Sequence, residues 1–202
     1  MRKRALMLIA VILAFGCGFA VGSYKNQKHA TFDDMLVNHP HELSGLVTPG
    51  DTRVKNLAAE LKTPQNAYLF VRDRIADDPS LPAMTGGEII SAGKAGCLGK
   101  AILLCSLYRA MGMPAANVRV VAGEVDYPTG IVDHAWVDFE FNGINIQQDA
   151  SNFLGKFGFD QFRGTIYTQT FIRDEEVVFN DKSFAIVSPL NLLKGSGHPV
   201  IH

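Results

Sequence analysis

Residues 94–114 read KAGCLGKAILLCSLYRAMGMP, and this stretch decides the fold of the 202-residue chain. It predicts a helix that opens at Cys97 and stops at Gly112, since Pro114 prevents continuation. The helix is apolar on nearly every side, which is typical of a buried helix. It is too short to span a membrane, and it carries Lys100. The sequence therefore predicts a central helix with a cysteine in its first turn.

That cysteine differs in its setting from the next one along the chain. At Cys97 the unpaired backbone N–H groups and the positive end of the helix dipole favour thiolate over thiol. Cys105 follows eight residues later on the same helix. At helical rise the two Cα atoms lie ~12 Å apart, whereas a disulfide needs less than ~7 Å. We expect no bridge between them, and we interpret Cys105 as a small core residue.

Composition and charge narrow the class of protein. A hydrophobic content of 47% and a formal net charge of −1 suit one globular domain with a real core. After the first residues there is no basic run and no interleaving of basic and aromatic side chains. We therefore expect no nucleic-acid partner.

The first 22 residues form a distinct segment. Met-Arg-Lys-Arg precedes an unbroken apolar run over residues 5–22, which is the pattern of an export signal. The excess of positive charge before the run places the body on the non-cytoplasmic side. Three fates stay open: cleavage before Ser23, retention as an inner-membrane anchor, or lipid modification of Cys17. The body is therefore expected to be periplasmic or extracellular, with membrane contact through residues 5–22 if the anchor is kept.

We divide the chain into three parts: a signal peptide or membrane anchor over 1–23, a linker and weakly structured lead-in over 24–50, and one domain over 51–202. His39 and His41 in the lead-in have no Cys, Asp or Glu at ligand spacing beside them. A solvated loop is the simpler interpretation there, and we expect no metal site.

Helical and alternating patterns are segregated along the domain. Before the central helix we predict helices over residues 51–61, 63–76 and 85–90. After it we predict strands over residues 118–125, 133–141, 144–149, 165–171, 176–179 and 184–187. This order indicates an α+β fold, with N-terminal helices and a central buried helix packed on an antiparallel β-sheet.

A β-hairpin is predicted around Asn142-Gly143, the strongest short-range hairpin signal. In that register Phe141 faces Ile144. One face of the hairpin is then apolar and the other is polar. His134 becomes the diagonal neighbour of Asp149 on the polar face, within reach of a hydrogen bond. A slip of one residue would put the two side chains on opposite faces.

Cysteine at a helix N-terminus with histidine and aspartate on adjacent strands is the composition of a thiol nucleophile with an oriented base. Cys97 would attack an acyl carbon. His134 would pair with the thiolate and later protonate the leaving amine, and Asp149 would hold the imidazole tautomer. The backbone N–H of Cys97 is the expected oxyanion donor. The second donor is unassigned, with Ser91 or a loop amide as candidates.

The same residues carry a family resemblance. Gly-Lys-Ala-Gly-Cys97, Leu-Tyr-Arg-Ala-Met-Gly-Met-Pro-Ala115, Asp-His-Ala-Trp136 and Gln-Gln-Asp149 follow one another in order. This pattern resembles the transglutaminase-like superfamily of papain-like thiol enzymes, above all its bacterial cysteine peptidases. The resemblance implies a papain/transglutaminase-like fold for residues 51–202, with Cys97, His134 and Asp149 as a catalytic triad. Many members have Asp-Pro-Thr where this chain has Asp-Ala-Ser151.

Three functions compete. The first is an exported thiol hydrolase that cleaves peptide or amide bonds in a protein or peptide substrate. The second is an acyltransferase that uses the same triad to cross-link glutamine side chains to amines. The third is a non-catalytic binding domain, against which the complete triad argues. Some relatives of the family use calcium, but no EF-hand-like run of acids occurs, and we expect neither a metal nor a cofactor.

Two further expectations concern the neighbourhood of the triad. Trp136 is interpreted as a packing residue, with a place in the wall of the site as one form of that role and contact with substrate as the alternative. Substrate specificity is expected to lie in loops over residues 123–132 and 151–164.

Overall fold

The computed structural model describes residues 35, 38–128 and 130–188, with helices in its first half and strands in its second. Ahead of the central helix come η1 (Pro40–Glu42), α2 (Leu43–Leu46), α3 (Thr52–Leu61), α4 (Pro64–Arg74), β1 (Ala76–Asp77), α5 (Gly86–Ala92) and β2 (Lys94–Ala95). The central helix is α6 (Cys97–Ala110). After it come η2 (Ala115–Asn117), β3 (Val118–Tyr127), β4 (Gly130–Phe141), β5 (Ile144–Gln148), β6 (Phe162–Arg163), α7 (Ile166–Phe171), β7 (Ile172–Phe179) and β8 (Phe184–Ile186).

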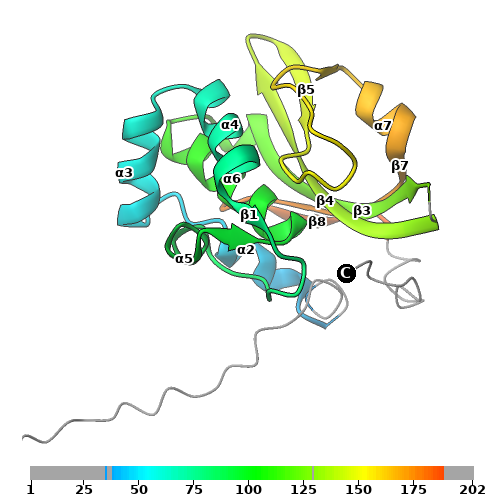
Figure 1. Cartoon of the computed structure of the whole chain (residues 1–202), viewed down its shortest axis with the longest axis horizontal. Helices are drawn as coiled ribbons and strands as arrows, with labels where there is room; N and C mark the ends of the chain where they lie inside the picture. The colour runs from blue at the N-terminus through cyan, green and yellow to red at the C-terminus, as the bar shows by residue number, and fades with distance from the viewer. Residues whose placement is uncertain (1–34, 36–37, 129, 189–202) are drawn as a thin grey trace, which may run out of the picture.

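The strands β3 to β8 form one antiparallel sheet in the order β6-β5-β4-β3-β7-β8. Helix α6 packs on β3 and β4, and α3, α4 and α5 pack around α6 on the side away from the sheet (Figure 1). Helix α7 packs near β3, β5 and β7 on the other face of the sheet. The predicted α+β architecture is confirmed.

Helix α6 is the buried element that its composition predicts. Every residue over 98–108 is buried, including Lys100. A side chain at Gly99 would bring its Cβ 2.8 Å from the Cβ of Ala95, so glycine allows the first turn to approach β2 closely. Tight packing on both sides therefore fixes the place of the N-terminus of α6.

Local capping signals set the ends of the flanking helices. Asp51 and Thr63 cap α3 and α4, and Thr85 forms the predicted capping box with Glu88 on α5. Helix α4 ends earlier than predicted, because Ala76 begins the short strand β1. That strand pairs in parallel with β2, within the stretch predicted as a loop before the central helix. The β1–β2 pair thus anchors the chain immediately before α6.

The hairpin has the predicted register. Phe141 pairs with Ile144, and Val137 pairs with Gln148. Asn142 and Gly143 both have positive φ angles, 54° and 75°, as a type I′ turn requires. The predicted placing of the two hairpin faces follows from this register.

Most of the polar face of the hairpin is buried, and only Glu140 and Asn145 beside the turn are exposed on it. A second, smaller core covers it, formed by Val121, Val125, Val132, Trp136, Phe162 and Tyr167. The prediction of a strand over 165–171 is wrong, since that segment forms α7. Its β-branched and aromatic residues favour a strand locally, but helical spacing lets Tyr167 and Phe171 pack together over the sheet.

The lead-in also differs from the prediction. Leu43 and Val47, within the segment expected to be weakly structured, are buried in the main core. The predicted leader over 1–23 lies outside the described residues, as does the chain from 189 onward. Within the described ranges no helix has the length and apolar character of a membrane span.

Candidate active site

Cys97 is the first residue of α6. The residue before it, Gly96, is the N-cap and has extended backbone angles. Because glycine offers no side-chain cap, no side chain occupies the N–H groups of the first turn. Cys97 is half-buried, so its sulfur stands at the junction of core and solvent. The helix therefore presents a thiol together with backbone donors that have no side-chain cap.

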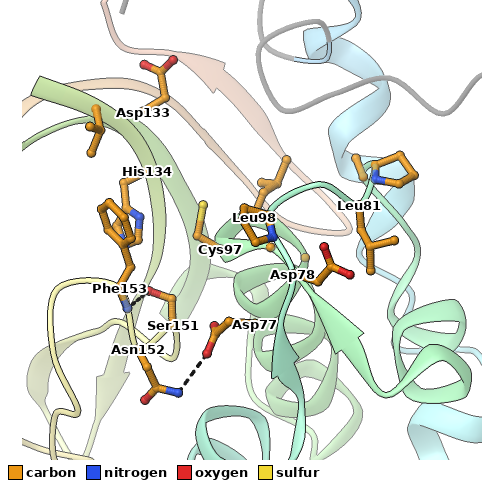
Figure 2. Close-up of a pocket in the computed structure, with 16 residues that line it drawn as sticks. Asp77, Asp78, Leu81, Cys97, Leu98, Asp133, His134, Ser151, Asn152 and Phe153 are labelled. Atoms are coloured by element: carbon orange, nitrogen blue, oxygen red, sulfur yellow. Dashed lines mark hydrogen bonds between the residues drawn. The ribbon is translucent and has the colours of Figure 1, made fainter. Parts of the chain in front are cut away.

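His134 on β4 and Asp149 directly after β5 form the predicted hydrogen bond. The distance from His134 Nε2 to Asp149 Oδ2 is 2.9 Å, and both side chains are almost fully buried. The hairpin register places them on the same face of the sheet. The Cys97 side chain lines the same pocket as this imidazole (Figure 2).

The Asp149 carboxylate accepts three further hydrogen bonds. Its Oδ1 accepts from the backbone N–H and the hydroxyl of Ser151, at 2.8 and 2.7 Å. Its Oδ2 accepts from the hydroxyl of Tyr167 at 3.2 Å. A carboxylate with this many donors is held rigidly. Asp149 therefore fixes the orientation of the imidazole that it contacts.

The charge state of His134 follows from two opposing effects. Burial disfavours the charged ring and by itself lowers its pKa. The negative charges of Asp149 and Cys97, with a hydrogen bond from the ring to each, outweigh burial and raise the pKa of His134 to about 10. His134 is thus protonated at neutral pH, which is the charge state that pairs with a thiolate.

Tyr167 stays a neutral donor in this setting. Burial first, and the negative charge of Asp149 second, raise the pKa of its phenol well above the usual value. The ring packs against Trp136 in the second core, at a centroid distance of 5.8 Å. Packing therefore holds Tyr167 in a fixed place, from which its O–H donates to the carboxylate.

A pocket of about 290 Å³ opens beside the Cys97 sulfur. Figure 2 shows Cys97 between His134 on one side and Leu98 and Leu81 on the other. Most of the surface lining the pocket is apolar, and three carboxylates also line it: Asp77, Asp78 and Asp133. The pocket therefore gives a peptide-sized group access to the thiol.

Phe153 forms part of the wall of this pocket and covers the imidazole (Figure 2). Its ring stacks on His134 at a centroid distance of 5.6 Å and on Tyr127 at 4.5 Å. Two aromatic rings in sequence thus shield the histidine from water on that side. Such shielding strengthens the electrostatic interactions of the ring.

Comparison with known proteins agrees with this architecture. Residues 51–149 match the family model of the transglutaminase-like superfamily. These residues form a transglutaminase-like domain. No curated protein sequence matches the chain.

Among solved structures, LapG of Legionella pneumophila has 14% sequence identity and a TM-score of 0.49, over 77% of this chain and 91% of LapG. A proposed cysteine protease from Cytophaga hutchinsonii has 13% identity and a TM-score of 0.43, over 74% of this chain and 54% of that one.

The transglutaminase-like domain brings together all three predicted site residues: Cys97, His134 and Asp149. One other candidate, Ser91, lies elsewhere. Ser91 does not line the pocket: its hydroxyl donates to the Gly87 carbonyl and accepts from Arg53. It therefore has no place as an oxyanion donor.

One expectation about the surroundings of the site is confirmed and another is corrected. Trp136 packs inside the second core, in agreement with the packing interpretation, and it does not line the pocket. Most of the predicted specificity loop over 123–132 is strand, because β3 and β4 continue to Tyr127 and from Gly130. The pocket wall opposite the 151–164 segment comes instead from the chain between β1 and α5.

Sequence reasoning missed the residues that support the triad. Ser151 follows Asp149 at the spacing of an Asx turn, so the Asp-Ala-Ser sequence contained that signal. No local signal marks Tyr167 as a donor to Asp149, because the sequence predicts a strand for its segment. The contact of Phe153 with His134 depends on the path of a loop, which local sequence does not determine.

Within the described residues, no three His, Cys, Asp or Glu side chains gather in a way that could hold a metal ion.

Proposed function

We propose that this transglutaminase-like domain is a thiol hydrolase that cleaves peptide or amide bonds through an acyl-enzyme. The observation that carries the proposal is the position of His134, which bonds the buried Asp149 carboxylate and lines the pocket with the Cys97 thiol. A thiolate beside an imidazolium is a nucleophile and a general acid held ready together.

In the first step the Cys97 sulfur attacks the carbonyl carbon of the substrate, and a C–S bond forms. The carbon–nitrogen bond breaks as His134 transfers its proton to the departing amine. Asp149 keeps the ring oriented throughout and does not take the proton. The product amine leaves, and the acyl group stays on the sulfur as a thioester.

In the second step the neutral His134 takes a proton from water, and the resulting hydroxide attacks the thioester carbon. The C–S bond breaks, which releases the carboxylic acid and restores the thiolate–imidazolium pair. During both steps negative charge develops on the carbonyl oxygen. The Cys97 N–H, in an uncapped first turn, is the donor we assign to that oxygen.

The test is cleavage of a mixed peptide library, with new N-termini identified by mass spectrometry. Wild type should generate them and Cys97→Ala should not. A fluorescent primary amine added to the same reaction distinguishes the acyltransferase: its incorporation into glutamine side chains without hydrolysis would replace the hydrolase. If wild type is folded and its Cys97 is reactive, but neither cleavage nor amine incorporation occurs, the domain is non-catalytic.

We propose further that the domain acts in the periplasm or outside the cell. The support is the basic start and the apolar run over residues 5–22. Expression of the full chain, followed by cell fractionation and N-terminal sequencing, should find the domain on the non-cytoplasmic side. A cytoplasmic, full-length product would contradict the proposal.

A further inference from the structure

We infer that Lys100, Asp77 and Asn152 form a positioning clamp, which holds the thiol end of α6 against the loop that carries Asp149 and Phe153. The inference rests on the proposed function, because it concerns the reactivity of Cys97. None of the three clamp residues is assigned to the chemical steps. Their part is to keep the reacting groups in register.

Lys100 lies one turn into α6 from Cys97, and its side chain is 1% exposed. Its Nζ lies 2.6 Å from Asp77 Oδ1. Burial of an ammonium ion is costly, and an apolar residue would fill the same space without that cost. The first turn of α6 is therefore tied to one particular carboxylate, beyond what packing requires.

Asp77 reaches three parts of the site. It lies on β1, whose partner β2 directly precedes Gly96 and Cys97. Its Oδ1 contacts Lys100, and its Oδ2 accepts a hydrogen bond from Asn152 Nδ2 at 3.0 Å (Figure 2). One carboxylate thus joins the helix, the strand that leads into it and the opposite wall of the pocket.

Asn152 connects the clamp to the acid and base of the site. Its Nδ2 also donates to the Arg72 carbonyl at 3.2 Å, which anchors it to the end of α4. The residue before it is Ser151, with two hydrogen bonds to Asp149, and the residue after it is Phe153, which stacks on His134. A shift of Asn152 would therefore move the contacts that orient the imidazole.

The clamp joins α6 to the loop after β5 by side-chain contacts, in addition to the packing of α6 on β3 and β4. Cys97 comes with α6, while His134 and Asp149 come with the sheet. The separation of sulfur and imidazole determines how well a thiolate is stabilised, since their attraction depends on distance. Loosening the clamp should therefore raise the pH at which Cys97 becomes reactive, in addition to any change in stability.

The experiment measures the rate at which iodoacetamide alkylates Cys97 in the full chain as a function of pH. Asn152→Ala removes one exposed side chain and leaves the ion pair in place. We expect its rate near neutral pH to fall about tenfold, as loss of a hydrogen bond to a charged group implies, with the midpoint of the profile moved upward. Lys156→Ala is the matched control, because Lys156 lies on the same loop and pairs with Asp73 away from the pocket.

A second variant, Lys100→Met with Asp77→Asn, removes both charges and keeps the volume of the side chains. Only the Lys100 side of this ion pair is buried, since Asp77 is 42% exposed. Replacement of a buried charge and its partner by neutral groups of similar size is often well tolerated by the fold. We expect this variant to melt cooperatively and still show the slower, shifted alkylation profile. Thermal unfolding of each variant is recorded beside the profile.

The outcomes separate the two proposals. An unreactive Cys97 in wild type would overturn the proposed function itself. A reactive wild type whose Asn152→Ala and double variants keep its pH profile would overturn the clamp and leave the hydrolase standing. Equal slowing of Cys97 alkylation in Lys156→Ala would also overturn the clamp, because any disturbance of the loop would then be enough to slow the reaction.

Discussion

Helix α6 carries two cysteines in opposite environments. Cys97, in the first turn, is half-buried and lines the pocket beside His134. Cys105, two turns further along, is fully buried, and burial raises the pKa of its thiol. The same residue type on one helix is thus a candidate nucleophile at one end and an inert core group in the middle. Neighbours, and not the side chain itself, determine which it is.

The first turn and the middle of α6 depend on different kinds of contact. The middle of α6 is enclosed by helices and by the sheet, and its role is to pack. The first turn needs donors and charges from β4, from the turn after β5 and from α7. Loss of a partner should therefore affect the chemistry at the first turn and mainly the stability at the middle.

The largest expected effect separates the two cysteines directly. Cys97→Ala should lower the rate of peptide cleavage by at least about 10⁴-fold, because removal of a nucleophile leaves only the contribution of binding and the oxyanion site. Cys105→Ala should leave the rate within about twofold of wild type and lower the free energy of unfolding by about 1 kcal/mol. Steady-state cleavage and urea unfolding of both variants measure this. Equal loss of cleavage in the two would contradict the comparison.

The next effect removes the partner of the thiolate. His134→Ala should slow alkylation of Cys97 near pH 7 by about tenfold or more, because an ordinary cysteine is only a few per cent thiolate there. Alkylation of Cys105 should stay undetectable in the folded protein. Mass spectrometry of the alkylated peptides gives both rates. An unchanged rate at Cys97 would mean that the helix N-terminus alone activates the thiol.

A smaller effect tests the donors around Asp149. Tyr167→Phe removes one hydrogen bond to the carboxylate and should lower the cleavage rate about tenfold, as a bond to a charged group is worth about 1.5–3 kcal/mol. Tyr108→Phe is the matched control, because that buried hydroxyl donates to Gln148 in the main core. It should lower the melting temperature without changing the rate. A loss of cleavage in Tyr108→Phe but not in Tyr167→Phe would contradict the role assigned to the Tyr167 hydroxyl.

The last effect concerns the dependence of stability on pH and not a reaction rate. The pKa of His134 is raised from 6.5 to about 10 in the folded protein, so the folded state binds the proton more tightly than the unfolded state. The resulting stability is fully present below pH 6.5 and is lost as pH rises toward about 10. Wild type should lose more unfolding free energy across this window than His134→Gln, as denaturant titrations can measure. Parallel curves would show that the ring is not charged in the fold.

Much of the fold was predictable because its signals are local. The apolar run before Gly112, the capping box at Thr85 and the Asn142-Gly143 turn each determine an element from adjacent residues. The hairpin register then determines that His134 and Asp149 share a face, because alternation along a strand has a strict period of two. The sequence alone therefore predicts the pairing of His134 with Asp149.

The remainder depends on contacts between distant segments. The sequence predicts a strand over 165–171, because the residues there have strand propensities. In the structure this segment is helix α7, whose side chains pack in the second core. The burial of Lys100 could not be predicted, because its partner Asp77 lies on a two-residue strand far back in the chain. How α6 docks on the sheet, and so whether Cys97 meets His134, is likewise a property of the whole core.

One measurement tests the central claim most directly: the rate of iodoacetamide alkylation of Cys97 and Cys105 in the folded wild type, from about pH 5 to about pH 9, located by peptide mass spectrometry. We predict a fast reaction at Cys97 that persists well below the pH at which a free cysteine ionises, and no reaction at Cys105 until the protein is unfolded. A Cys97 that reacts only at the pH of a free thiol, or no faster than Cys105, would contradict the account.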